Sequence, residues 1–378
     1  MSNNYAGLKA RLRGEKGAAE RCAERLLAIR KRLEPIRKRK SDSTLLLATW
    51  NIRDFDSGKF GWGKRRPETL YYIAEMIACF DLVAVQEVAR DLGPLEEVMR
   101  ILGREWDYIA TDTTEGPGGN GERMAFLYNT EKVWFRKVAG EIVLPDGQLI
   151  VSKKKVAARD NQPDVAPTTV EMKQQFARSP FLVAFQSGWF RFSLCTVHIY
   201  FGDDSGEKLK RRIAEIEALV KFFADRQDSE TRAERDSRGA VENYILLGDF
   251  NVVSPEHKTM AALKGQGFAV PPQIDGRQVR KLGDHFYDQI AVRVKDPRFE
   301  VLRGGLIDLF EDVFRDTPED RAIYDAHVPQ GDGPSDGDGD RYLTWRTWQM
   351  SDHAPLWVEI RTDFADAYLA GIAGLPPG

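Results

Sequence analysis

The sequence predicts an α/β protein in which buried strands alternate with helices. After Ser41, short apolar runs are separated by amphipathic stretches at helical spacing. Runs such as Leu45–Trp50 are apolar almost throughout, which is typical of strands covered on both faces. A chain of 378 residues with 42% hydrophobic and 10% aromatic side chains can also bury a substantial core. These observations exclude disorder as the overall state.

The first 40 residues predict a basic helical extension. They hold 13 Lys/Arg and 4 Glu, whereas the rest of the chain holds 42 basic and 54 acidic residues. Leucines and alanines recur loosely at helical spacing from Tyr5 to about Lys40, where Pro35 and a basic cluster end the pattern. Such a helix packs on the body, pairs with a second copy or attracts nucleic acid. Its apolar face has no Trp or Phe, so we expect no firm membrane insertion.

The elements that follow are read from these patterns in chain order. Helices are expected at Pro67–Phe80, Leu92–Leu102 and Ser205–Asp225. Strands are expected at Leu45–Trp50, Asp81–Val85, Arg123–Tyr128, Phe181–Gln186, Phe190–Val197, Tyr244–Leu247, Phe286–Val292 and Pro355–Ile360. Two polar segments, Ser152–Ala177 and Gly331–Asp340, are expected to be long loops.

The organisation after the extension is that of one unit. No internal repeat or boundary follows residue 41, so we expect a catalytic domain over 41–363 and a tail over 364–378. No apolar run is long enough to span a membrane, and the charged N-terminus is unlike a signal peptide. The three cysteines lack metal or redox spacing. These features predict a cytoplasmic protein with reduced thiols.

Polar side chains follow several of the buried strands, where each apolar run ends. They are Asn51, Glu87, His198, the Asp249-Phe250-Asn251 stretch and the Ser351-Asp352-His353 stretch before the last strand. Each alone has a structural explanation, such as a turn cap, a surface ion pair or a core histidine. Together they predict a cleft in which rigid elements hold the polar groups.

The chemistry of these groups favours a magnesium site. Glu87, Asn51, Asp249 and Asp352 provide hard oxygen ligands, which suit Mg²⁺ and also Mn²⁺. Five histidines without a cysteine cluster make zinc an unsuitable ion. The acidic Gly331–Asp340 segment leaves Ca²⁺ open. Phosphodiester hydrolysis, which needs charge compensation and proton transfer, is a reaction that such a set can perform.

The ordered motifs resemble those of a known family. The stretches 50–53 (Trp-Asn-Ile-Arg), 86–87 (Gln-Glu), 248–251 (Gly-Asp-Phe-Asn), 287–288 (Tyr-Asp) and 351–353 (Ser-Asp-His), with His198, resemble the series of the endonuclease/exonuclease/phosphatase superfamily from Leu45 to Ile360. Arg53 is closer to the pancreatic-type deoxyribonucleases than to the abasic-site endonucleases, which have Asp there. Glu-Arg at 122–123 and the stretch 176–180 (Phe-Ala-Arg-Ser-Pro) also resemble the deoxyribonuclease branch.

The resemblance implies a four-layer α-β-β-α sandwich of two packed mixed sheets flanked by helices. It implies that Asn51, Glu87 and Asp352 bind or orient metal, and that Asp249 and Asn251 position water and phosphate. His198 and His353 would be the paired acid/base and phosphate-contacting histidines, with Asp288 supporting His353. Weaker matches make Asp112 the support of His198, with Glu115 as a competitor, and make Arg123 and Arg178 phosphate contacts.

The function that the resemblance implies is metal-dependent hydrolysis of nucleic acid, as an endonuclease on DNA rather than RNA. The acidic body argues against this substrate, because nucleic-acid binding draws on positive surfaces. One alternative is a phospholipid head group, inositol phosphate or nucleotide as substrate. Another is a catalytically idle scaffold. Tyr342, Trp345 and Trp348 either stack on a base at the cleft mouth or pack inside the sandwich.

Overall fold

Two β-sheets pack face to face in the computed structural model, which describes residues 3–56, 58, 60–114, 120–156, 168–237, 242–277, 285–329 and 340–376. In these ranges the first sheet has the order β12-β13-β1-β2-β4-β3 and the second the order β11-β10-β9-β8-β5. The strands of the first sheet are β1 Thr44–Phe55, β2 Leu82–Val88, β3 Trp106–Ala110, β4 Arg123–Asn129, β12 Val301–Leu306 and β13 Leu356–Arg361. Those of the second are β5 Trp134–Glu141, β8 Phe181–Ser187, β9 Phe190–His198, β10 Tyr244–Asp249 and β11 Asp288–Arg293.

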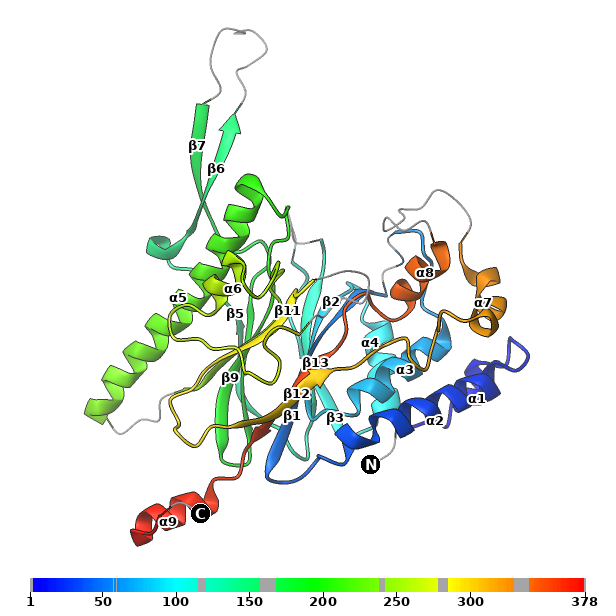
Figure 1. Ribbon diagram of the computed structural model, residues 1–378, viewed down its shortest axis with the longest axis horizontal. Helices are drawn as coiled ribbons and strands as arrows, with labels where there is room; N and C mark the ends of the chain where they lie inside the picture. The colour runs from blue at the N-terminus through cyan, green and yellow to red at the C-terminus, as the bar shows by residue number, and fades with distance from the viewer. Residues whose placement is uncertain are drawn as a thin grey trace.

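The central strands are buried on both faces because helices cover the outer face of each sheet (Figure 1). In β1, Leu45 and Leu47 face the layer between the sheets, whereas Leu46, Ala48 and Trp50 join a second cluster under the helices. Helices α2 Ala18–Arg37, α3 Pro67–Ile77 and α4 Gly93–Leu102 contribute to that second cluster. Helices α5 Gly206–Ser237 and α6 Lys258–Leu263 contribute to the core of the second sheet. The predicted four-layer α-β-β-α class is therefore confirmed.

The N-terminal extension packs on this body. It forms α1 Leu8–Arg11 and α2, which run along the helices of the first sheet (Figure 1). Its buried apolar side chains join the second cluster; they are Leu8, Leu12, Ala18, Cys22, Leu26, Ile29 and Leu33. Pro35 lies inside α2 and does not end it, since the helix continues to Arg37. Of the three possibilities for this helix, the structure shows packing on the body; self-association stays a prediction.

The basic side chains of the extension pair with carboxylates of the body. Arg25 Nη2 lies 2.5 Å from Asp320 Oδ1, and Arg32 Nε lies 2.5 Å from Asp312 Oδ2. Similar pairs join Arg11 to Glu97, Arg37 to Glu75 and Arg39 to Glu359. The unequal charge of the two parts of the sequence is therefore explained in part by ion pairs that hold the basic extension on the acidic body.

The segment expected to be a long loop at Ser152–Ala177 contains a hairpin instead. Strands β6 Ile150–Val156 and β7 Thr168–Gln174 pair antiparallel and project from the body beside α5 (Figure 1). Of the other expected loop, Gly331–Asp340, only Asp340 is described, and it caps α8 Arg341–Gln349 by accepting from the Tyr342 and Leu343 backbone.

The remaining elements are short. They are α7 Pro318–Tyr324, α9 Ala365–Ala373 in the expected tail, and the 3₁₀ turns Asp146–Gln148 and Asp325–His327. None of the helices in the described ranges has the length and apolarity that crossing a membrane requires.

Candidate active site

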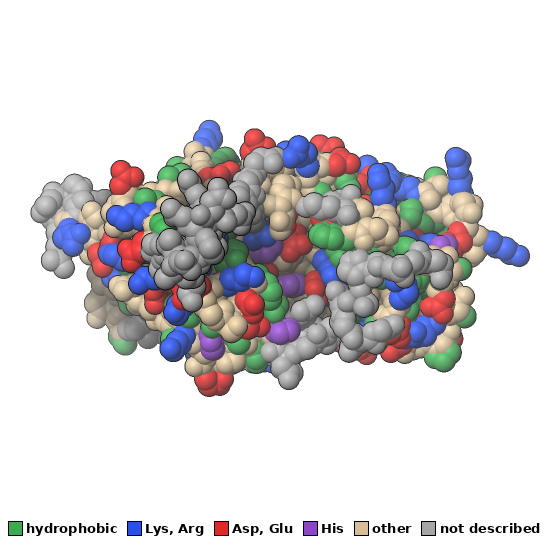
Figure 2. All heavy atoms as spheres, turned by 90° about the horizontal axis from the view of Figure 1, so that it is seen from above, with side chains coloured by type: hydrophobic (Ala, Val, Ile, Leu, Met, Phe, Trp, Pro, Cys, Tyr) green, Lys and Arg blue, Asp and Glu red, His purple; other side chains and the backbone are tan. Residues whose placement is uncertain are grey.

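The polar residues at the strand ends converge at one edge of the sandwich. Strands β1 and β2 run parallel, as do β9 and β10, so their carboxyl ends point to the same edge of each sheet. Asn51 Nδ2 donates to Glu87 Oε1 at 2.8 Å and to Asp249 Oδ2 at 3.1 Å. Viewed from above, this face is hollowed, with histidine side chains in the hollow beside acidic and basic ones (Figure 2).

The backbone is specialised where these side chains emerge. Glu87 has φ 60° and Asn251 has φ 52°, a region that residues other than glycine rarely occupy and that is frequent at functional sites. Gly248 has φ 129°, and a Cβ there would lie 2.2 Å from the Val197 carbonyl oxygen. Asn251 stabilises the turn that follows. Its backbone N–H donates to Asp249 Oδ1 at 2.9 Å, and its side-chain Nδ2 donates to the Ile199 carbonyl.

His198 is paired with a residue that the sequence analysis did not assign to it. Its Nδ1 lies 3.1 Å from Glu122 Oε2, and its Nε2 lies 3.6 Å from Asp249 Oδ2 and 3.8 Å from Glu87 Oε1. Glu122 also accepts from Arg178 Nε at 3.0 Å. The buried Arg178 is thus connected to the site by its ion pair with Glu122, and it helps to hold Glu122 beside His198.

The expected role of Asp112 is corrected by this pairing. Asp112 is exposed and accepts from Arg123 Nη1 at 3.1 Å, while the same nitrogen donates to the Thr111 carbonyl at 2.7 Å. Arg123 begins β4, but its guanidinium is engaged by Thr111 and Asp112, which follow β3, the strand outside β4 in the sheet. Glu115, the competitor considered for Asp112, lies outside the described residues.

His353 forms the second histidine–carboxylate pair. Its Nδ1 lies 2.5 Å from Asp288 Oδ2, and Asp288 is fully buried. The neighbouring Ser351 hydroxyl donates to the Asn51 carbonyl at 2.7 Å and accepts from the His353 backbone at 3.0 Å. Asp352 Oδ1 lies 4.0 Å from His353 Nε2, and its Oδ2 lies 3.6 Å from Arg53 Nη1.

The two pairs favour charged imidazoles. Burial and Arg178 lower the pKa of His198, but Glu122 and Asp249 outweigh them and the net pKa is raised. Burial raises the pKa of Glu122, while His198 and Arg178 lower it to about 2. For His353, burial lowers the pKa and Asp288 raises it by more. Burial raises the pKa of Asp288 as well, but the contact with His353 Nδ1 keeps the shared proton on the imidazole.

Three contacts of the site join the two sheets: His198 with Glu122, His353 with Asp288, and Asn51 with Asp249. His198 ends β9 of the second sheet, and its partner Glu122 precedes β4 of the first. His353 precedes β13 of the first sheet, and its partner Asp288 begins β11 of the second. Asn51 of β1 reaches Asp249 of β10 in the same way. The arrangement can hold a phosphate between two proton-bearing imidazoles and a group of oxygen ligands.

No protein-family model matches the chain, and no curated protein matches it either.

Solved structures do match. One is an endonuclease/exonuclease/phosphatase family protein from Bacteroides thetaiotaomicron, at 19% identity and TM-score 0.49 over 85% of this chain and 96% of that one. Another is a mannosyl-6-phosphatase from the same organism, at 19% identity and TM-score 0.48 over 84% and 99%. A third is TDP2 from D. rerio complexed with a single-strand DNA product, at 12% identity and TM-score 0.47 over 85% and 100%. At such identities, a function has to be argued from the side chains of this chain.

The residues at the site fit a divalent metal ion. Asn51 Oδ1 is buried and has no hydrogen-bond partner among the described residues, while its Nδ2 faces Glu87 and Asp249. In the described ranges no group of three or more His, Cys, Asp or Glu side chains is arranged as a metal site. Mg²⁺ commonly uses one or two carboxylates and keeps several waters, so an amide oxygen and Glu87 are a sufficient protein share.

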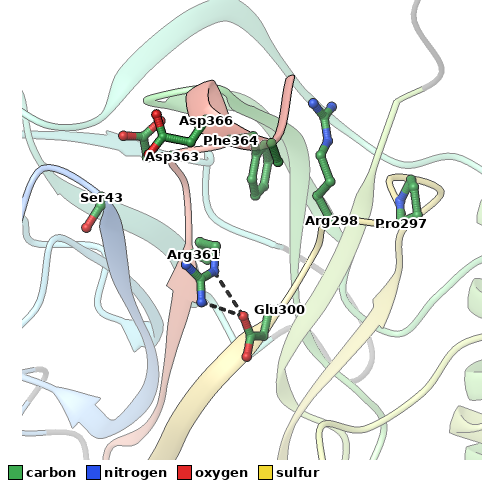
Figure 3. A pocket seen from close by; sticks show the side chains of 9 residues that line it. Ser43, Pro297, Arg298, Glu300, Arg361, Asp363, Phe364 and Asp366 are labelled. Carbon is green, nitrogen blue, oxygen red and sulfur yellow. Dashed lines mark hydrogen bonds and ion pairs between the residues drawn. The ribbon is translucent and has the colours of Figure 1, made fainter. Parts of the chain in front are cut away.

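A cavity of about 780 Å³ lies away from these residues (Figure 3). Its lining includes Ser43, Phe364 and the ion pair of Arg361 with Glu300, whose Nη2 and Oε2 are 2.8 Å apart. Ser43 precedes the start of β1, whereas Asn51 lies near its end, so the cavity is at the opposite edge of the sandwich. It has no part in the chemistry described above.

Proposed function

We propose that this chain hydrolyses phosphodiester bonds with a divalent metal ion, as a member of the endonuclease/exonuclease/phosphatase superfamily. The observation that carries the proposal is the meeting of His198–Glu122 and His353–Asp288 around Asn51, which also contacts Glu87 and Asp249. Support comes from the ordered motif series, which contains these residues apart from Glu122 of the Glu-Arg stretch at 122–123, and from their contacts at one edge of the sandwich.

The roles follow from the contacts. Asn51 and Glu87 would hold the metal, and Asp352 would add to its ligands as the family resemblance implies; the ion would supply charge neutralisation at a phosphoryl oxygen. His353 holds a proton on the ring while Asp288 fixes its orientation. Asp249, close to His198 Nε2, orients the attacking water.

We propose nucleic acid, and DNA before RNA, as the substrate. Two short motifs that resemble the deoxyribonuclease branch supply Glu122 and Arg178, and these two side chains form one ion pair that supports His198. This pairing gives both motifs a common physical role at the site and supports a nuclease of that branch.

A small phosphoester is the second candidate, and a specific observation favours it. Arg25, Arg32 and Arg37 of the extension are bound to carboxylates of the body, so part of the positive charge of the arm is neutralised within the molecule and attracts a nucleic-acid backbone less strongly. A smaller substrate needs less long-range attraction.

Cleavage of a substrate panel tests the proposal. Labelled single- and double-stranded DNA, RNA, a bis-nitrophenyl diester and a nitrophenyl monoester are incubated with Mg²⁺, Mn²⁺ or EDTA. Asp249→Asn and His353→Asn are compared with His257→Asn, a control in which Asn can replace the helix-capping contact of His257 with the Thr259 backbone.

We expect metal-dependent cleavage of DNA, a loss on the order of a hundredfold or more in the two site variants, and little change in the control. Activity on the small diester or monoester alone would favour the second candidate. Cleavage that survives EDTA, or that is unchanged in both site variants, would refute the mechanism.

A further inference from the structure

Two exposed phenylalanines flank the candidate active site, one on the side of each sheet. Phe60 is 47% exposed, and its ring centroid lies 5.0 Å from that of Trp348. The Trp348 ring also stacks with Trp62, at 6.4 Å between centroids, and the Arg53 guanidinium lies 4.0 Å from its centroid. Arg53 in turn lies 3.6 Å from Asp352, the residue before His353. The Phe60–Trp348 pair is thus connected to Asp352 through Arg53.

Phe201 forms the corresponding feature on the side of the second sheet. It is 45% exposed, and its ring meets the edge of Tyr287 at 6.0 Å between centroids and 73° between planes. Tyr287 precedes Asp288 in the chain, and its ring lies 5.8 Å from that of His353. Contacts therefore lead from both aromatic pairs to His353, through Tyr287 on this side and through Arg53 and Asp352 on the other.

A buried arginine holds Phe201 in place, whereas the Phe60 ring packs on the half-buried Trp348. Arg212 is fully buried; its Nε donates to the Phe201 carbonyl at 2.8 Å and its Nη1 donates to the Asn251 carbonyl at 3.0 Å. This connects the backbone of Phe201 to the turn that carries Asp249 and Asn251. Trp348 is half-buried at the end of α8, where Tyr342 and Trp345 are buried and serve packing.

We infer that the substrate carries nucleobases on both sides of the scissile phosphate, with Phe60 stacking on one and Phe201 on the other. Exposed rings on rigid supports are how proteins hold bases of single strands without reading their sequence, since every base offers a π-face. A nucleic-acid strand presents a base on each side of a phosphodiester, whereas a phospholipid head group or inositol phosphate presents no aromatic face, so two exposed rings at the site favour a nucleic-acid strand. The inference rests on the proposed phosphodiesterase and names its substrate class as single-stranded nucleic acid.

The test uses oligonucleotides that contain a single phosphodiester among methylphosphonate linkages. One has bases on both sides of that bond, one is abasic on the 5′ side and one is abasic on the 3′ side. Phe60→Leu and Phe201→Leu remove each ring while keeping an apolar side chain. Trp134→Leu is the control, because Trp134 is 63% exposed but pairs with Gln186 at the opposite end of the second sheet.

We expect each Phe variant to lower kcat/KM for the complete oligonucleotide by about fivefold to tenfold, mainly through KM, with no change for Trp134→Leu. Each Phe variant should match the wild type on one of the two abasic oligonucleotides, and the two variants should differ in which one. Equal losses on complete and abasic oligonucleotides would overturn base stacking while leaving the phosphodiesterase intact. If the wild type cleaves none of them but cleaves the bis-nitrophenyl diester, the inference fails while the phosphodiesterase stands; if it cleaves neither, both fail.

Discussion

Glu215 of α5 provides a stability test that is independent of catalysis. Its side chain is fully buried; Oε1 accepts from the Ala177 and Tyr200 backbone at 3.3 and 3.4 Å, and Oε2 has no hydrogen-bond partner among the described residues. Burial raises the pKa of this carboxyl from an ordinary 4.5 to about 7, although Arg211 and the two backbone donors work in the other direction.

The direction of the pH effect follows from the raised pKa. The folded protein binds this proton more tightly than the unfolded chain, so the stabilisation is complete below about pH 4.5 and is lost as the pH rises to about 7. At about 1.4 kcal/mol per pH unit, the wild type loses ~3 kcal/mol of unfolding free energy over that window. Glu215→Gln keeps an acceptor for the two backbone groups and never ionises, so it should escape the loss.

Urea unfolding of the wild type and Glu215→Gln, followed by circular dichroism at pH 5, 6, 7 and 8 in EDTA, measures this difference. The free energy of unfolding of the variant minus that of the wild type should increase by ~2.5 kcal/mol from pH 5 to pH 8, because part of the loss has already occurred at pH 5. Glu217→Gln, at an exposed position on the same helix, should show a flat difference. A flat difference for Glu215→Gln as well would refute the assignment of a buried neutral carboxyl.

Three further substitutions test other parts of the structure. Glu122→Gln removes the negative partner that raises the pKa of His198, so kcat should fall on the order of a hundredfold and the alkaline limb of the pH–rate profile should move to lower pH, whereas an unchanged profile would contradict the pairing. Glu87→Gln should raise the Mg²⁺ concentration for half-maximal activity by about tenfold or more, with an unchanged circular dichroism spectrum, and an unaltered Mg²⁺ titration would exclude Glu87 as a ligand. Asp320→Asn weakens the buried contacts that Asp320 makes with Arg25 of the extension and with Arg315, and should lower the unfolding free energy by about 3 kcal/mol in urea; a change below the error of the measurement would show that these pairs contribute little to stability.

The central strands were predictable because their burial leaves a direct pattern. Runs such as Leu45–Trp50 are apolar on both faces, and the structure places them in the middle of each sheet. The missed strands β3, β5 and β12 lie at or near sheet edges, where partial exposure permits polar residues and glycines. The hairpin β6–β7 was missed because its lysines and the prolines between its strands resemble a loop.

The site residues that directly follow or precede a buried strand could be predicted, because the end of an apolar run marks them in the sequence. Glu122 was named in a motif but given no role, although register could have identified it: Arg123 pairs with Val88, one residue after Glu87. Glu122 therefore lies at the same edge as Glu87. Asp112 follows β3, whose Ala110 pairs with Ala125, which puts it one strand further from the centre. Such distinctions depend on strand order, and strand order is set by tertiary packing.

The histidine–carboxylate contacts that cross between the sheets also connect catalysis to the mechanics of the sandwich. The pairs His198–Glu122 and His353–Asp288 hold the two sheets together at one edge. A local separation of the sheets there therefore breaks both pairs before the core is exposed. Activity and histidine protonation would then report this partial opening, at denaturant concentrations where the global fold is intact. A ligand that contacts both pairs would oppose this separation, and backbone amide exchange near His198 at the end of β9 and near Asp288 at the start of β11 would slow.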